Sequence, residues 1–214
     1  MAQEKEKGPS LTFRPAQPSD ASQVSRLIYE TFPKMATFIL GLGDAEQAKA
    51  ILAKLFTQPG HRFSYEFTRI IIHNDRVIGM FIAYSGSDLL TLNWRLARLL
   101  VTQYSLAEKL KLIQRGLPVI FIQEAASDEY LLSNLAVKKG QRGKGIGTQI
   151  LAYLEAQAKQ TGFHKLSLMV TIDNQDARRF YERHGFHIKT LHLESDRRAS
   201  FLGPGYQRMV KELD

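Results

Sequence analysis

Cysteine is absent from the 214 residues of this chain. Disulfides, thiolate metal sites and any mechanism through a cysteinyl acyl-enzyme are therefore excluded. No apolar run approaches the roughly 18 residues that a membrane-spanning helix needs. Residues 1–8 are mostly polar and of mixed charge, without the apolar core of a secretory signal. We therefore expect a cytoplasmic protein with a flexible N-terminal tail over residues 1–10.

Blocks of five or more like charges are also missing, although the net charge is +8. A positive balance fits a nucleic-acid partner, a polyanionic cofactor or a surface that only aids solubility. The basic residues are scattered and do not interleave with aromatic residues, as a nucleic-acid surface would require. We therefore expect neither a nucleic-acid nor a membrane partner, and a cofactor interpretation needs a located site.

The hydrophobic pattern predicts one mixed α/β domain over residues 11–214. Apolar positions recur at helical spacing in some segments and alternate in others. Helices are expected at 20–28, 45–56, 148–160 and 176–183. Strands are expected at 11–14, 63–72, 77–84, 130–137, 166–172, 186–193 and 206–210. A further extended piece is expected at 119–122.

A leucine-rich stretch at 85–115 interrupts the strands and predicts one or two inserted helices. Two interpretations stay open, a core or partner-helix contact and a lid over a substrate site. As a lid, its basic residues would suit acidic or neutral amines better than polyamines. The basic and aromatic residues concerned are Trp94, Arg95, Arg98, Tyr104, Lys109 and Lys111.

A glycine-rich turn at 142–147 joins a predicted strand to a predicted helix and is the strongest functional signal. The first N–H groups of a helix lack intrahelical partners, and the helix dipole adds positive charge there. Glycines let a phosphate approach the backbone, and Arg142 and Lys144 add full charges. The turn departs from both phosphate-binding loop patterns, because no hydroxyl residue follows Lys144 and the last glycine spacing is wrong. A tight strand-to-helix connection without a ligand is the structural alternative.

The turn resembles the acetyl-CoA motif R/Q-x-x-G-x-G/A of the GNAT superfamily, with Arg142, Gly145 and Gly147 at its fixed positions. A second stretch resembles the family signature N-x-x-A-x-x-x-Y-x-x-x-G-F. It comprises Asn174, Ala177, Tyr181, Gly185 and Phe186. Two signatures in the right order and at the right spacing are more specific than either alone.

This resemblance implies a GNAT-like fold with acetyl-CoA as co-substrate. Its central, mostly antiparallel twisted sheet would be splayed between the fourth and fifth strands and flanked by helices, with the 85–115 insertion added. The pantetheine arm would lie in the splay. The implied cofactor-binding residues are Leu135, Ala136, Val137, Arg142, Gly143, Lys144, Gly145, Ile146, Gly147, Thr148, Asn174, Ala177 and Tyr181.

The resemblance also implies catalytic roles. Tyr181 would be the general acid for the coenzyme A thiolate, and the Leu135 N–H would donate to the carbonyl oxygen. Some relatives carry a glutamate base where this chain has Leu131. Glu129 lies on the same strand face and is our first candidate for the base, through a water, and Glu66 is the second. Each of these side chains also has a plain structural interpretation, as core, cap or solvated charge.

The function predicted is acetyl transfer from acetyl-CoA to a primary amine of a small molecule or peptide, by direct attack in a ternary complex. The alternative is a non-catalytic coenzyme A-binding regulatory module on the same fold. No metal site is expected, because the six histidines lack a carboxylate motif. A homodimer through the C-terminal strands is a further expectation from the resemblance.

Overall fold

The structure is a computed structural model that describes residues 10–120 and 122–214. Its centre is a seven-stranded sheet in the order β1-β2-β3-β4-β5-β7-β6. All neighbouring strands pair antiparallel except β4 and β5, which are parallel. The predicted mixed α/β fold with a mostly antiparallel sheet is thus confirmed. The strands are β1 (Thr12–Pro15), β2 (Thr68–His73), β3 (Arg76–Ser85), β4 (Tyr130–Val137), β5 (Lys165–Thr171), β6 (His187–Leu193) and β7 (Gly205–Glu212).

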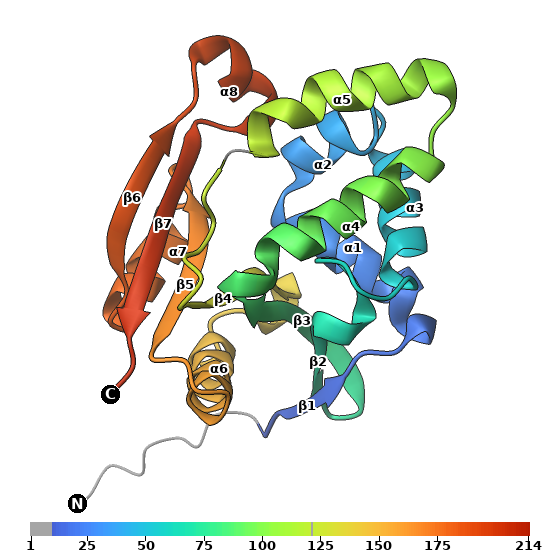
Figure 1. Cartoon of the computed structure of the whole chain (residues 1–214). Coiled ribbons are helices and arrows are strands. Elements are labelled where there is room, and N and C mark those ends of the chain that lie inside the picture. The colour runs from blue at the N-terminus through green and yellow to red at the C-terminus, as the bar shows by residue number, and fades with distance from the viewer. Residues whose placement is uncertain (1–9, 121) are drawn as a thin grey trace, which may run out of the picture.

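Helices cover both faces of this sheet (Figure 1). One face packs against α1 to α5, and the other packs against α6 and α7. The helices are α1 (Ala21–Thr31), α2 (Pro33–Ile39), α3 (Ala45–Phe56), α4 (Leu89–Thr102), α5 (Leu106–Ile120), α6 (Ile146–Gln160), α7 (Gln175–Arg183) and α8 (Asp196–Leu202).

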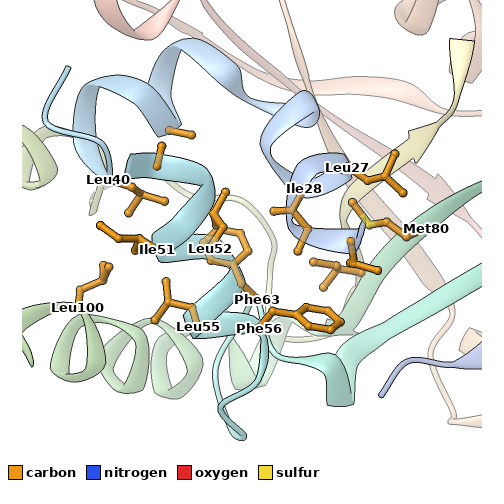
Figure 2. Close-up of a cluster of buried hydrophobic side chains, with 14 of the residues drawn as sticks. Leu27, Ile28, Leu40, Ile51, Leu52, Leu55, Phe56, Phe63, Met80 and Leu100 are labelled. Atoms are coloured by element: carbon orange, nitrogen blue, oxygen red, sulfur yellow. The ribbon is translucent and has the colours of Figure 1, made fainter. Parts of the chain in front are cut away.

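Alternation along β3 explains why the sheet can be covered twice. Met80 and Ile82 face the first core cluster, whereas Phe81 and Ala83 face the second. Successive side chains of a strand point to opposite faces, so a continuous apolar run serves two cores. Figure 2 shows the first cluster, in which side chains of α1 and α3 meet those of the sheet.

The inserted segment forms α4 and α5, as predicted, but α5 continues further than the pattern indicated. The expected extended piece at 119–122 is wrong, because α5 runs to Ile120 and Ile122 belongs to no strand. Residue 121 lies outside the described residues. Pro118 stands in the last turn of α5, where its missing N–H costs a single hydrogen bond before the helix ends.

One strand boundary and two short helices also differ from the prediction. The strand expected at 63–72 begins only at Thr68, since Ser64 accepts a hydrogen bond from the Glu66 amide and caps a short 3-10 turn before it. The short helices α2 and α8 were not predicted. Of the predicted N-terminal tail, residues 1–9 lie outside the described residues. No helix in the described part of the chain is long and apolar enough to cross a membrane.

Candidate active site

The parallel strands β4 and β5 separate about halfway along their length. They pair only from Tyr130 to Leu132 on β4 and from Leu166 to Leu168 on β5. Beyond these pairs, β4 continues to Val137 and β5 to Thr171. The predicted splay between the fourth and fifth strands is therefore present, and it leaves backbone groups of both strands without a strand partner.

A cleft of about 520 Å³ occupies this opening. Six of the predicted site residues line it, and they come from β4, the glycine-rich turn and α7. These residues are Leu135, Val137, Arg142, Asn174, Ala177 and Tyr181. The structure thus brings together two sequence signatures that lie some thirty residues apart in the chain.

The glycine-rich turn leaves the start of α6 open. Gly143 and Gly145 have φ values of +78° and +72°, and nothing lies within 4 Å of a Cβ at either position. Gly145 stands at the N-cap of α6, and no side chain caps the helix there. The first amides of α6 and the helix dipole are therefore available to an anion, and a β-carbon would fill the space that such a ligand needs.

Charged and packing residues hold this turn in place. The Nε of Arg142 donates to the Val137 carbonyl at 3.0 Å, and the Nζ of Lys144 donates to Gln141 at 3.2 Å. A Cβ on Gly147 would meet the ring of Phe180 at 2.7 Å, so this glycine allows α6 to pack against α7. Ile146 is buried in the core. Gly147 and Ile146 therefore have packing roles whatever the turn binds.

The second signature builds α7 and places Tyr181 in the cleft. Asn174 caps α7 by accepting a hydrogen bond from the Ala177 amide at 3.1 Å. Tyr181 packs edge-on against Phe180 and Phe186. Gly185, at a φ of +87°, ends the helix and lets the Phe186 amide bond back to the Tyr181 carbonyl.

Burial raises the pKa of the Tyr181 phenol to about 12. The side chain is only 9% exposed, yet the residue lines the cleft, and its hydroxyl has no hydrogen-bond partner within residues 10–120 and 122–214. The hydroxyl therefore stays protonated at any physiological pH and is free to donate.

The remaining predicted cofactor-binding residues are not among those that line the cleft. Thr148 shares a hydrogen bond of 2.9 Å with the Nε2 of His184. Ala136 is buried and packs in the first core cluster. Its neighbours Leu135 and Val137 are partly exposed, as the alternation of β4 requires.

The structure does not bring either candidate base into the cleft lining. Glu129 is buried in an ion pair with Arg208 and also accepts from the Ala126 amide at 2.9 Å. Glu66 accepts from the Gly60 amide at 2.6 Å and is exposed at the surface.

Strand parity predicted that Glu129 shares a face of β4 with Leu135. This is wrong, because the register between β3 and β4 shifts, so that Leu131 packs in the first core cluster and Leu135 against the second. Arg208 on β7 binds the Glu129 carboxylate instead.

A partly buried polar network at the other end of the cleft was not predicted from the sequence. Arg62 forms a two-pronged ion pair with Glu124, with both N–O distances 2.5 Å. The same guanidinium donates to Ser133 and Asn93 at 3.2 Å each. Tyr84 donates to Ser133 as well, at 3.1 Å. No sequence signal marked this network, because Arg62 and Glu124 lie 62 residues apart in segments without a motif.

Within residues 10–120 and 122–214, no three histidine, aspartate or glutamate side chains converge as metal ligands would. Buried His61 is a core residue. Its Nδ1 accepts from the Phe63 amide, so its Nε2 carries the hydrogen and donates to the Leu55 carbonyl at 2.9 Å.

Known proteins share both the sequence pattern and the fold. Residues 43–186 match the sequence profile of the Acetyltransferase (GNAT) family. An uncharacterised N-acetyltransferase of Bacillus subtilis is 40% identical over 63 residues, which are 29% of this chain and 40% of that protein. An aminoalkylphosphonate N-acetyltransferase of Salmonella typhimurium is 40% identical over 55 residues, or 26% of this chain and 36% of that protein. The chain thus matches well under half the length of these two relatives.

Solved structures agree over nearly the whole chain. An N-acetyltransferase from Staphylococcus aureus Mu50 has a TM-score of 0.71 and 24% identity, covering 93% of this chain and 99% of that one. Another structure described as an acetyltransferase has a TM-score of 0.65 and 24% identity, covering 95% of this chain and 100% of that one. At this identity the likeness shows the fold alone.

Proposed function

Because the chain belongs to the Acetyltransferase (GNAT) family, we propose that it transfers the acetyl group of acetyl-CoA to a primary amine of a small molecule or peptide. The reaction would run by direct attack in a ternary complex. The observation that carries this proposal is the cleft where β4 and β5 part, which opens beside the uncapped start of α6.

The residues present fit coenzyme A, because the turn offers open space, free amides and cations where a pyrophosphate needs them. The amides from Gly143 to Thr148 would hold the pyrophosphate, with Arg142 and Lys144 adding charge. The edge of β4 at Leu135 and Val137, with which β5 does not pair, would hold the pantetheine amides in place of a strand partner. Bound acetyl-CoA supplies an activated acetyl thioester.

Two groups of this chain would then assist the transfer. The Leu135 N–H lies where β4 has lost its β5 partner, and it would donate to the carbonyl oxygen as negative charge develops. The Tyr181 hydroxyl would donate to the departing sulfur. Since the Tyr181 pKa of about 12 exceeds the roughly 8.5 of a free thiol, its contribution begins as a hydrogen bond to the sulfur.

The acceptor nitrogen must be neutral when it attacks, and we propose that its proton is lost to water in the open cleft. The carboxylates of Glu129 and Glu66 are engaged elsewhere. The rate constant kcat/KM should therefore rise about tenfold per pH unit below the amine pKa of about 10. A steady-state pH profile checks this, and a plateau near neutral pH would instead reveal a base on the enzyme.

The direct test has two parts. Coenzyme A at millimolar concentration should raise the melting temperature of the purified protein, because a ligand that binds only the folded state stabilises it. Thiol release from acetyl-CoA should then depend on an added amine. Absence of the thermal shift would overturn the site assignment. A shift without amine-dependent thiol release would indicate a binding module and not an enzyme.

A further inference from the structure

The acceptor end of the cleft is the end that lies away from the pyrophosphate turn. Arg62 bonds to Ser133, whereas Arg142 bonds to the Val137 carbonyl. Four residues of extended strand separate these two points of β4, or about 13 Å. The cofactor would enter from the Arg142 side, so the side chains around Ser133 face the incoming amine.

Three charged side chains line this acceptor end, namely Glu30, Arg62 and Glu124. The guanidinium of Arg62 is already committed, since its terminal nitrogens bond to Glu124, Ser133 and Asn93 and its Nε is buried. Burial lowers the pKa of Arg62, but the ion pair with Glu124 raises it, and because the net shift is upward the guanidinium stays charged. A carboxylate or phosphonate on the acceptor would find no free cation here.

Glu30 is the third charged side chain at this end of the cleft. It lies on the last turn of α1 and is exposed, and it forms no ion pair within the described part of the chain. The next residue, Thr31, accepts a hydrogen bond of 2.7 Å from Asn134 on β4. This bond fixes the end of α1 over the middle of β4 and holds Glu30 at the cleft.

Apolar side chains line the cleft together with the charged groups. The rings of Phe32 and Phe63 stack with their centroids 5.5 Å apart, and Met35 and Ile122 also line the cleft. An alkyl chain can therefore lie against this wall while a charged end reaches Glu30.

The basic residues of the insertion do not reverse this charge balance. The cleft lining includes none of the four basic residues of the insertion, Arg95, Arg98, Lys109 and Lys111. The helix α4 contacts the network of Arg62 and Glu124 only through a hydrogen bond from Arg62 to Asn93, as far as the described residues show. The expectation that a basic lid favours acidic or neutral acceptors is therefore not supported by the residues that line the site.

We infer that the acceptor is an alkyl amine that carries a second positive charge and no negative charge, with its distal ammonium beside Glu30 and its chain along Phe32 and Phe63. This inference rests on the proposed function, and it names the class of substrate that the same cleft takes.

The test uses four amines of similar length, namely a diaminobutane, an aminobutanol, an aminobutanoate and an aminopropylphosphonate. Each is titrated by calorimetry into the coenzyme A-loaded protein, and kcat/KM is measured with acetyl-CoA. One exposed charge pair changes affinity roughly two- to fivefold, so the diamine should exceed the alcohol by about that factor. The carboxylate and the phosphonate should fall below the alcohol in both measurements.

The variant Glu30→Gln should bring the diamine down to the level of the alcohol and leave the alcohol unchanged. Glu46→Gln is the matched control, because Glu46 is a surface carboxylate that pairs with Lys49 and does not line the cleft. It should leave the order of the four amines intact.

The possible failures are distinguishable. If the aminophosphonate or the aminobutanoate binds best, or if Glu30→Gln leaves the diamine preference intact, this inference is overturned while the proposed function stands. If coenzyme A does not bind, the proposed function fails first. If the diamine binds as expected but no amine is acetylated, the acceptor class is retained and catalysis is rejected.

Discussion

Tyr181 can act as a donor because burial keeps its phenol neutral. We predict that Tyr181→Phe lowers kcat by about a hundredfold or more, the usual contribution of a proton donor in the transition state. Coenzyme A affinity should change little, because the ring still packs between Phe180 and Phe186. Calorimetry and steady-state kinetics measure the two effects separately. Loss of affinity with unchanged turnover of the bound complex would show that Tyr181 holds the cofactor only.

Gly145 and Gly162 bracket α6 and allow a matched comparison. Both have positive φ, +72° and +82°, and a Cβ at either would meet nothing within 4 Å. We predict that Gly145→Asp abolishes measurable coenzyme A binding, because it places a carboxylate beside the uncapped amides. Gly162→Asp should impose a similar backbone strain and leave coenzyme A binding intact. Equal coenzyme A affinities of the two variants, measured by calorimetry, would show that the turn is not part of the binding site.

At the scale of elements, α4 has two unlike faces. Leu92 and Leu100 are buried against the first core cluster. Leu90 and Trp94 point away from it and are 69% and 66% exposed. The leucine periodicity therefore predicted the helix correctly without showing which leucines are core, because both faces of α4 are apolar.

This asymmetry gives a stability prediction. Leu92→Ala should lower the free energy of unfolding by about 2–5 kcal/mol, since it leaves a cavity in a packed core. Leu90→Ala on the same helix should change it by less than about 0.5 kcal/mol, because the side chain is mostly in water. Urea unfolding of both variants measures the difference, and equal losses would mean that α4 does not pack as described.

At the scale of the whole molecule, buried tyrosines make the folded state lose stability at alkaline pH. Burial raises the pKa of Tyr84, Tyr181 and Tyr206 to about 12 in the folded protein. The unfolded value is about 10, so the folded state binds more protons between these two values. Stability is therefore fully present below about pH 10 and is lost as the pH rises toward 12.

We predict that tyrosinate absorbance from these residues appears together with the loss of helical circular dichroism and not before it. Tyr181→Phe removes one of the phenols whose pKa is raised, so the stability of this variant should fall less steeply with pH than that of the unchanged protein. Ionisation of all eight tyrosines well below the unfolding transition would contradict the burial described.

Much of the architecture was predictable because it depends on neighbours in the chain. Helical spacing indicated the longer helices and alternating spacing indicated the strands. The glycines of the turn indicated a helix start without a side-chain cap. The spacing from Asn174 to Phe186 placed a cap, a tyrosine and a helix stop on one short element. Errors concentrated where local pattern is ambiguous, at Pro118 and before Thr68.

Only the tertiary structure decided which distant segments of the chain are in contact. The sequence by itself determined where most strands and the longer helices lie and where the glycine-rich turn falls, since these follow from periodicity or from steric rules among neighbouring residues. The splayed sheet and the place of Tyr181 were expectations from the resemblance to the GNAT superfamily, and only the packing of the strands realises them. The sequence did not determine that Arg208 engages Glu129 across 79 positions or that Arg62 engages Glu124 across 62. Burial of a charge demands a partner but does not say which one, and only the packing of strands and loops brings that partner within reach.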